Sequence, residues 1–198
     1  MTTPVLILGG GPVGLTLALL RSRAGFVPRV LEAGPDIAEE LRASTFHPPS
    51  LDMLDTLGIA APLIEQGLIT PTWQIRWHEV NEFALFDLSV LKDDTAHPYR
   101  LQAEQHKLSR LLLAALPAGT VRFGAEVAEV TQDADGATVR LADGETLRAA
   151  WIVGCDGARS VVRRAMGLDF PGDTYPETTI LATTSFDFAK VLPGLSNV

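Results

Sequence analysis

Three glycines near the start of the chain, Gly9, Gly11 and Gly14, have the spacing G-x-G-x-x-G. The apolar run before them predicts a short buried strand over residues 4–8, and the run after them predicts a helix over about 13–25. In such a turn the first glycine permits the bend, the second lets the backbone approach a pyrophosphate, and the third lets helix and strand pack closely. The N–H groups at the helix N-terminus favour the same anion. The spacing therefore predicts a dinucleotide-binding turn, and an ordinary βαβ turn is the alternative.

An acidic residue, Glu32, ends the next predicted strand, residues 28–32, about 20 residues beyond the glycines, where a ribose-binding acid is expected. A carboxylate at this end of a parallel strand can accept a hydrogen bond from a ribose 2′-hydroxyl and repels a 2′-phosphate. Glu32 therefore favours FAD or NAD over NADP at this site. The alternative is a solvated acid at the end of a strand.

A strand–helix–strand unit of this length indicates a parallel sheet with a right-handed crossover, and so an α/β fold of the Rossmann type. Short alternating strands from about 121 to 150, with turn signals at Asp135-Gly136 and Asp143-Gly144, predict a β-meander inserted in that sheet. Pro48 and Pro49 predict a loop that ends just before Ser50. Further helices are predicted at 35–41, 50–58, 61–66, 101–116 and 159–166.

From Thr72 to Tyr99 apolar and polar residues alternate, which predicts β-strands between the Rossmann elements. Aromatic residues such as Trp73 and Trp77 would form one face of a sheet packed on a core, or one wall of an apolar substrate pocket. A further strand is predicted from Thr178 to Phe188. The predicted domains are a Rossmann-like part, 1–70 with 98–175, and partial substrate-domain strands, 71–97 with 176–198.

The sequence has 198 residues with 24 acidic and 16 basic side chains, a formal net charge of −8. This balance argues against nucleic acid or an anionic membrane surface as the main partner. The single cysteine, Cys155, excludes an internal disulfide and fits a reducing compartment. No stretch has the pattern of a signal peptide or a membrane span, so a cytoplasmic location is expected.

A second polar segment, Gly154 to Arg163, follows another predicted strand, residues 151–154. Its Asp156 is expected at the same sheet edge as the glycine turn and Glu32. This carboxylate could accept N–H groups of its own turn, bond ribityl hydroxyls or hold water, while the nearby arginines attract phosphates. The alternative is an aspartate that caps the following helix, with arginines on the surface.

Four features agree with one protein family in order and spacing over residues 1 to about 170. They are the glycine turn with Glu32, the pair Arg42-Ala43, Gln102 at the opening of a predicted helix, and the segment from Gly154 to Arg163. Together they resemble the single-component, class A flavoprotein monooxygenases, the aromatic hydroxylases related to para-hydroxybenzoate hydroxylase. The resemblance implies a glutathione-reductase-type FAD-binding fold with an inserted β-meander, followed by the start of a β-rich substrate domain.

The resemblance also implies roles for the matched residues. The glycine turn would cradle the FAD pyrophosphate with backbone N–H groups from Pro12 and Val13, and Glu32 would bind the adenosine ribose. Arg42 and Gln102 would hold the region between the pyrophosphate and the ribityl chain. The expected cofactor contacts are Gly9, Gly11, Pro12, Val13, Gly14, Glu32, Arg42, Gln102, Val127 (by its backbone, near the adenine) and Asp156 (between the flavin and nicotinamide sites). No metal site is expected.

The implied reaction is reduction of FAD by NAD(P)H, addition of O₂ at the flavin C4a carbon, and transfer of hydroxyl from the resulting hydroperoxide to a phenolic ring. The expected partners are therefore a small aromatic substrate and O₂. Two alternatives in the same superfamily are a halogenase and an isoprenoid-chain reductase. The halogenase signature Trp-x-Trp-x-Ile-Pro is not reproduced by the segment from Trp73 to Trp77.

A third motif of the family, a Gly-Asp pair well beyond residue 200 that closes the Rossmann sheet, has no match in this sequence. We therefore expect the chain to be the N-terminal portion of a longer enzyme or a naturally short relative. A non-catalytic nucleotide-binding module is a further alternative. An uncovered sheet edge and apolar face favour association, so a homodimer is among the expected states.

Overall fold

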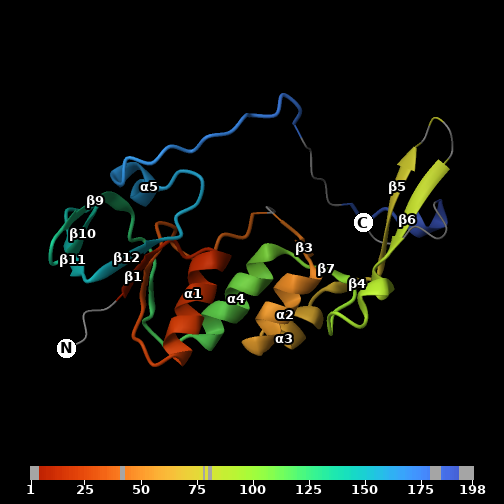
Figure 1. The fold of residues 1–198 in the computed structure, drawn as a ribbon, viewed down its shortest axis with the longest axis horizontal. Helices are drawn as coiled ribbons and strands as arrows, with labels where there is room; N and C mark the ends of the chain where they lie inside the picture. Colours follow the sequence, from red (N-terminus) through yellow and green to blue (C-terminus); the bar gives the residue numbers. More distant parts are fainter. Residues whose placement is uncertain (1–4, 41–42, 78, 80–81, 179–183, 192–198) are drawn as a thin grey trace. The chain divides into compact units, whose positions relative to one another are not determined.

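The structure is a computed structural model that describes residues 5–40, 43–77, 79, 82–178 and 184–191. It divides into two compact units: unit 1 comprises Met1–Glu40 and Leu108–Thr174, and unit 2 comprises Leu41–Lys107 and Tyr175–Val198. Helix α4 (Gln105–Ala115) begins in unit 2 and continues into unit 1. The domain division predicted from the sequence is a different one, and it stays a prediction. Figure 1 traces the whole chain by colour.

The centre of unit 1 is a four-stranded sheet with the order β12-β1-β2-β8, in which all three pairings are parallel. Its strands are β1 (Val5–Leu8), β2 (Arg29–Leu31), β8 (Val121–Arg122) and β12 (Trp151–Gly154). Helix α1 (Pro12–Arg23) connects β1 to β2 and lies beside β1 in Figure 1. The predicted α/β fold with a Rossmann-like parallel sheet is confirmed.

Strand β1 is buried on both faces, which explains why its sequence is an unbroken apolar run rather than an alternating one. Leu6 and Leu8 share one face, because side chains alternate along a strand. They pack with residues of the meander, among them Val139 and Leu141, in one buried cluster. This cluster joins the parallel sheet to the antiparallel strands that follow it.

The meander is an antiparallel sheet with the order β11-β10-β9. Its strands are β9 (Val127–Asp133), β10 (Gly136–Leu141) and β11 (Thr146–Ala149), and the short helix α5 (Val161–Ala165) follows β12. The predicted start of the meander at about 121 is wrong. The strand at Val121 is β8, which pairs with β2 at the edge of the parallel sheet.

Unit 2 contains a three-stranded antiparallel sheet with the order β3-β7-β4, and a separate hairpin of β5 and β6. The strands are β3 (Thr45–Phe46), β4 (Leu68–Thr70), β5 (Thr72–Trp77), β6 (Glu82–Asp87) and β7 (Arg100–Gln102). The helical elements are α2 (Pro48–Thr56), α3 (Ala60–Ile64) and two 3₁₀ turns, η1 (Leu88–Leu91) and η2 (Phe188–Lys190).

Two predictions about helices before residue 60 need correction. Residues 35–40 form no helix, and Leu41 lies outside the described residues. Asp36 instead accepts the N–H of its neighbour Ile37 at 2.7 Å, a local bond that competes with helix formation. The prolines Pro48 and Pro49 do not delay α2 but begin it, because proline is tolerated in the first turn of a helix, where the N–H groups have no intrahelical acceptor.

Two further predictions fail at strands. Gln102 does not open a helix, because Arg100–Gln102 forms β7 and pairs with both β3 and β4. The strand predicted from Thr178 to Phe188 is absent over residues 184–187, and Phe188 begins η2. Residues 179–183 of that segment lie outside the described residues. In the part of the chain that the structure describes, no helix is both long and apolar enough to cross a lipid bilayer.

Candidate cofactor-binding site

The turn between β1 and α1 requires glycine at two positions. Gly9 has a φ of +108°, and a Cβ there would lie 2.3 Å from the carbonyl oxygen of Cys155. A Cβ at Gly14 would lie 1.9 Å from the carbonyl oxygen of Gly9. These contacts are too close for any side chain, so the two glycines let the first turn of α1 pack against the backbone of the strand ends.

The N-terminus of α1 offers backbone donors to an anion. The helix begins after Gly11, whose carbonyl accepts the N–H of Leu15 at 3.0 Å, and no side chain of the described residues caps it. This geometry leaves the N–H groups of Val13 and Gly14 without an intrahelical acceptor. The implied N–H contact from Pro12 is wrong, because proline has no N–H group.

The space beside the same helix end fits a pyrophosphate. A Cβ added at Gly11 would meet nothing within 4 Å, so the backbone there faces open space. The first turn of α1 also contains no acidic residue that would repel an anion. An uncapped helix start with an exposed glycine backbone is the arrangement that binds phosphate groups, so the residues present fit the pyrophosphate of a dinucleotide.

Glu32 lies at this turn and is held there by the backbone. Its Oε2 accepts the N–H of Gly10 at 2.6 Å, and its Oε1 accepts the N–H of Gly34 at 2.8 Å. Each carboxylate oxygen keeps a further lone pair for a hydroxyl donor. The structure therefore places a fixed negative charge at the end of β2, where it can accept ribose hydroxyls and would repel a 2′-phosphate.

Asp156 caps helix α5. Its Oδ1 accepts the hydroxyl of Ser160 at 2.6 Å, and its Oδ2 accepts the N–H groups of Val161 and Val162 at 2.7 and 3.2 Å. The capping arrangement, the alternative raised by the sequence, is therefore present. A role for Asp156 between flavin and nicotinamide stays a prediction. Cys155, next to it, donates its backbone N–H to Leu8 at 2.7 Å, which fixes this segment beside β1.

The thiol of Cys155 is not a nucleophile candidate in this setting. Burial, with a smaller contribution from the negative charge of Asp156, raises its pKa above the ordinary thiol value. The protonated thiol is the unreactive form. The Cys155 thiol is therefore not expected to react at this site.

Two residues that the sequence reasoning did not single out complete the Asp156 turn. Ser160 is the N-cap of α5 and accepts the N–H of Arg163 at 3.0 Å. Gly154 lets α5 approach β12, because a Cβ there would lie 2.9 Å from the Cβ of Val162. A serine directly before an apolar helical run and a glycine at a strand end are signals that could have identified both.

The remaining predicted contacts lie elsewhere. Val127 begins β9 in unit 1, and Gln102 belongs to β7 in unit 2, where its Oε1 accepts the hydroxyl of Thr45 at 2.9 Å. Arg42 lies outside the described residues. Among the described residues no group of three or more His, Cys, Asp or Glu side chains could hold a metal ion.

Comparison with known proteins identifies the class of this site. A family model described as an FAD binding domain matches residues 2–196. The chain belongs to this FAD-binding family. Its cofactor is therefore FAD, one of the two nucleotides that the glycine turn and Glu32 favour.

Relatives of this FAD-binding domain include monooxygenases named for aromatic substrates and one named as a flavin-dependent monooxygenase, so the predicted family is confirmed. The chain is 36% identical to para-nitrophenol 4-monooxygenase of Pseudomonas sp. strain WBC-3 over 191 residues, 93% of this chain and 47% of that protein. It is 37% identical to 6-hydroxy-3-succinoylpyridine 3-monooxygenase HspB of Pseudomonas putida over 198 residues, 96% of this chain and 50% of that protein.

A solved structure agrees with this assignment. The p-nitrophenol 4-monooxygenase PnpA of Pseudomonas putida DLL-E4 superimposes with a TM-score of 0.81 at 35% identity, covering 88% of this chain and 46% of that one. The FAD-binding domain thus spans about half the length of the relatives it matches. The contacts of Gln102, Val127 and Asp156 with FAD stay predictions.

Proposed function

We propose that this chain is the FAD-binding part of an NAD(P)H-dependent monooxygenase that hydroxylates a small phenolic or other electron-rich aromatic ring with O₂. The observation that carries the proposal is the turn at Gly11, where an uncapped helix N-terminus, an open backbone face and the fixed carboxylate of Glu32 occur together. The named substrates of the two relatives, a nitrophenol and a hydroxylated pyridine, support an aromatic substrate. We place the protein in the cytoplasm.

The residues of unit 1 would bind and orient the cofactor rather than react. The N–H groups of Val13 and Gly14 would donate to the pyrophosphate, and Glu32 would accept from the adenosine ribose. FAD, when bound, supplies the redox chemistry and the activation of O₂, and the protein supplies position and exclusion of water. Asp156 would act through the turn it caps, since its oxygens already hold Ser160 and the start of α5.

Titration with FAD tests the proposal. We expect the purified chain to quench flavin fluorescence on binding, and Glu32→Gln to weaken binding about tenfold, because one charge-assisted acceptor for the ribose is lost. Glu129→Gln is the matched control, since Glu129 pairs with Arg140 on the exposed meander. Absence of FAD binding by the wild-type chain, or equal loss in both variants, would contradict the proposed site.

The reductant and the assembly need separate measurements. In the longer protein that contains this domain, anaerobic addition of NADH or NADPH is expected to bleach the flavin absorbance. In unit 1, β12 lies at the edge of the sheet order and Trp151 is 71% exposed, which supports the predicted association into a homodimer. A strictly monomeric species in sedimentation would contradict that part of the proposal.

A further inference from the structure

Arg100, on β7 of unit 2, has a guanidinium edge with no partner among the described residues. Its Nε and Nη2 atoms are both buried, and neither has a hydrogen-bond acceptor in that part of the chain. These two nitrogens lie on the same edge of the planar group, so their N–H bonds point in nearly the same direction. Together they form one fork, whose spacing matches the two oxygens of a carboxylate.

The chain uses the same edge of another arginine to bind a carboxylate. Arg140 donates its Nε and Nη2 to Oε2 of Glu129 at 3.0 and 2.7 Å. That pair is half-exposed, with side chains 51% and 52% accessible. At Arg100 the donors are buried, where water cannot replace a missing acceptor, so leaving them unpaired is unfavourable. A buried donor edge of a cation that has no acceptor therefore indicates a ligand with a complementary negative charge.

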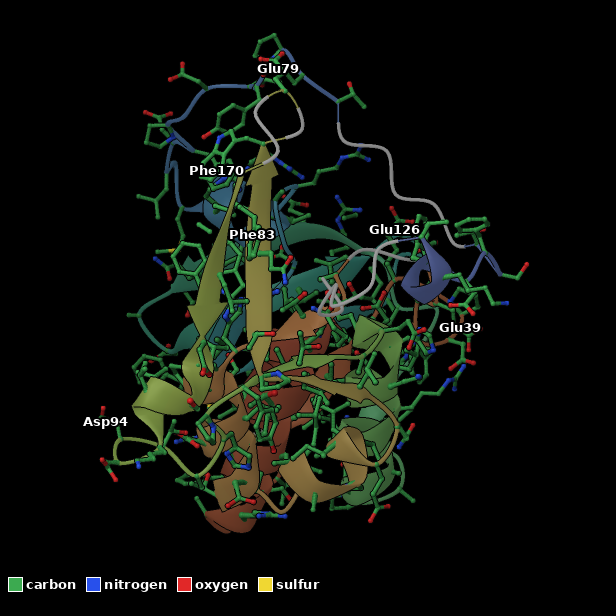
Figure 2. The ribbon with its side chains drawn as sticks, turned by 90° about the vertical axis from the view of Figure 1, so that its right-hand side faces the viewer. Glu39, Glu79, Phe83, Asp94, Glu126 and Phe170 are labelled. Carbon is green, nitrogen blue, oxygen red and sulfur yellow. The ribbon has the colours of Figure 1, made fainter. Side chains whose placement is uncertain are left out.

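One aromatic ring, that of Trp73, lies beside the guanidinium group of Arg100. Its guanidinium carbon lies 5.4 Å from the ring centroid of Trp73, and Trp73 stacks on Phe86 with centroids 4.1 Å apart and planes 10° from parallel. Both rings belong to the β5–β6 hairpin, where they are register partners. Figure 2 shows this hairpin with Phe83 labelled on β6. If a ligand that binds Arg100 through its anionic group also carries an aromatic ring, that ring would pack against the side chain of Trp73.

Arg100 also lies on the face of β7 that carries a predicted cofactor contact. Residues two apart on a strand point to the same face, so Arg100 and Gln102 share one face, while Leu101 between them is fully buried on the other. A ligand held by Arg100 therefore lies on the same face of β7 as Gln102.

We propose that the Nε–Nη2 edge of Arg100 binds the carboxylate of an aromatic ligand whose ring lies against Trp73. The inference rests on the proposed function, and it narrows the substrate class of that enzyme to aromatic acids. Arg100 as a whole residue is partly exposed, whereas its Nε–Nη2 edge is covered, so the proposal requires the covering side chain to move when the ligand binds. The shape of the fork selects a planar group with two oxygens and a negative charge.

Benzoate and benzamide are suitable probes because they have the same shape and differ in charge. Binding is measured by quenching of tryptophan fluorescence and by calorimetry, with the FAD-loaded chain and again with the FAD-free chain. We expect benzoate to bind at least about tenfold more tightly than benzamide, because a charge-assisted bidentate pair is lost in the amide. Arg100→Gln is expected to abolish the preference, and Arg100→Lys to keep part of it, since lysine has charge without the fork.

Thermal unfolding separates ligand binding from a structural role. Replacement of an unpaired buried charge by an apolar side chain is neutral or stabilising, so Arg100→Met is expected to match or exceed the wild-type Tm without ligand. Benzoate should raise the Tm of the wild type and not that of Arg100→Met. The matched control is Arg140→Gln, which removes the same type of fork from the meander and should leave the benzoate preference unchanged.

Three outcomes would overturn the inference. They are equal affinities for benzoate and benzamide in the wild type, an Arg100→Met variant with a lower Tm, and a variant that loses FAD or ADP affinity while the benzoate preference is kept. The last outcome would assign the fork to a cofactor phosphate. Failure of FAD binding alone would contradict the proposed function, and the FAD-free titration would still decide the role of Arg100.

Discussion

The two kinds of carboxylate in unit 1 are held in different ways. At the glycine turn, Glu32 and Asp156 accept backbone N–H groups and are partly buried. On the meander, Glu129, Asp133 and Glu145 pair with arginine side chains and are exposed, and of these three Asp133 also accepts the N–H of Asp135. The first kind fixes the path of the chain, because the donors are part of the backbone. The second kind lies on the surface of a sheet whose backbone path is already fixed by the hydrogen bonds between its strands.

This difference indicates where geometry is maintained for function. A surface ion pair contributes little, because water and salt compete with both partners. A carboxylate that bonds two backbone donors of a turn cannot be lost without leaving those donors unpaired or moving the turn. The glycine turn should therefore be sensitive to single substitutions that the meander tolerates, and the sensitivity should fall from Gly14 to Asp156 to the surface pairs.

The largest effect is expected at Gly14. A Cβ there would overlap the carbonyl of Gly9, so Gly14→Ala should cost at least about 2–3 kcal/mol of unfolding free energy in urea titrations. Gly11→Ala is the matched control, because its Cβ enters open space and its φ of −73° suits any residue. We expect Gly11→Ala to keep the stability and to weaken FAD binding. Equal losses of stability in both variants would contradict the packing described for the turn.

An intermediate effect is expected at Asp156. Asp156→Ala leaves the N–H groups of Val161 and Val162 without their acceptor and should cost about 1–2 kcal/mol of unfolding free energy. Hydrogen exchange should locate the loss in α5. Glu145→Ala, which removes the exposed pair with Arg122, is the comparison and should leave the melting temperature nearly unchanged. Equal losses of unfolding free energy in Asp156→Ala and Glu145→Ala would contradict the difference described between the glycine turn and the meander.

The smallest effect is expected at the pair of Asp133 and Arg148. Hydrogen bonds from Arg148, followed by the N–H of Asp135, lower the pKa of Asp133 from 3.8 to about 2. Because the folded-state pKa is depressed, the contribution to stability is present above pH 3.8 and is lost as the pH falls through about 2. Carboxyl chemical shifts should give this midpoint, and Arg148→Gln should move it upward. A large change in stability at neutral pH would contradict the description of this pair as a surface contact.

The cofactor-binding part of unit 1 could be predicted well from the sequence, because each of its elements has a local signal. Three local signals indicate this part of the backbone: the apolar run of β1, the glycine spacing and the acid that follows β2. The structure places all three at one turn. The capping role of Asp156 is likewise among the alternatives that the sequence raises, and Ser160 has the position of a helix N-cap. Strong local signals of this kind are therefore accessible from the sequence, whereas weaker ones failed at residues 35–40 and at Pro48 and Pro49.

Two of the errors concern pairings between segments far apart in the sequence. The apolar spacing after Gln102 predicts that it opens a helix, but β3 and β4 pair with Arg100–Gln102 and hold it as a strand. Because short strands are predicted after Val121, the sequence places Val121 in the meander. In the structure Val121 begins β8, which pairs with β2. The unpaired fork of Arg100 has no sequence signal, since the absence of a partner among the described residues is visible only when the neighbours are in place.

The pairing of β1 with β12 also has a consequence for synthesis of the chain. Val5–Leu8 takes Trp151–Gly154 as its neighbour, and the bend at Gly9 rests on the carbonyl of Cys155. The glycine turn is thus synthesised well before the segment that completes its surroundings. Contacts of such long sequence separation slow folding. Until the segment that contains β12 has also been synthesised, the apolar strand β1 lacks one of the two neighbours with which it pairs in the folded unit.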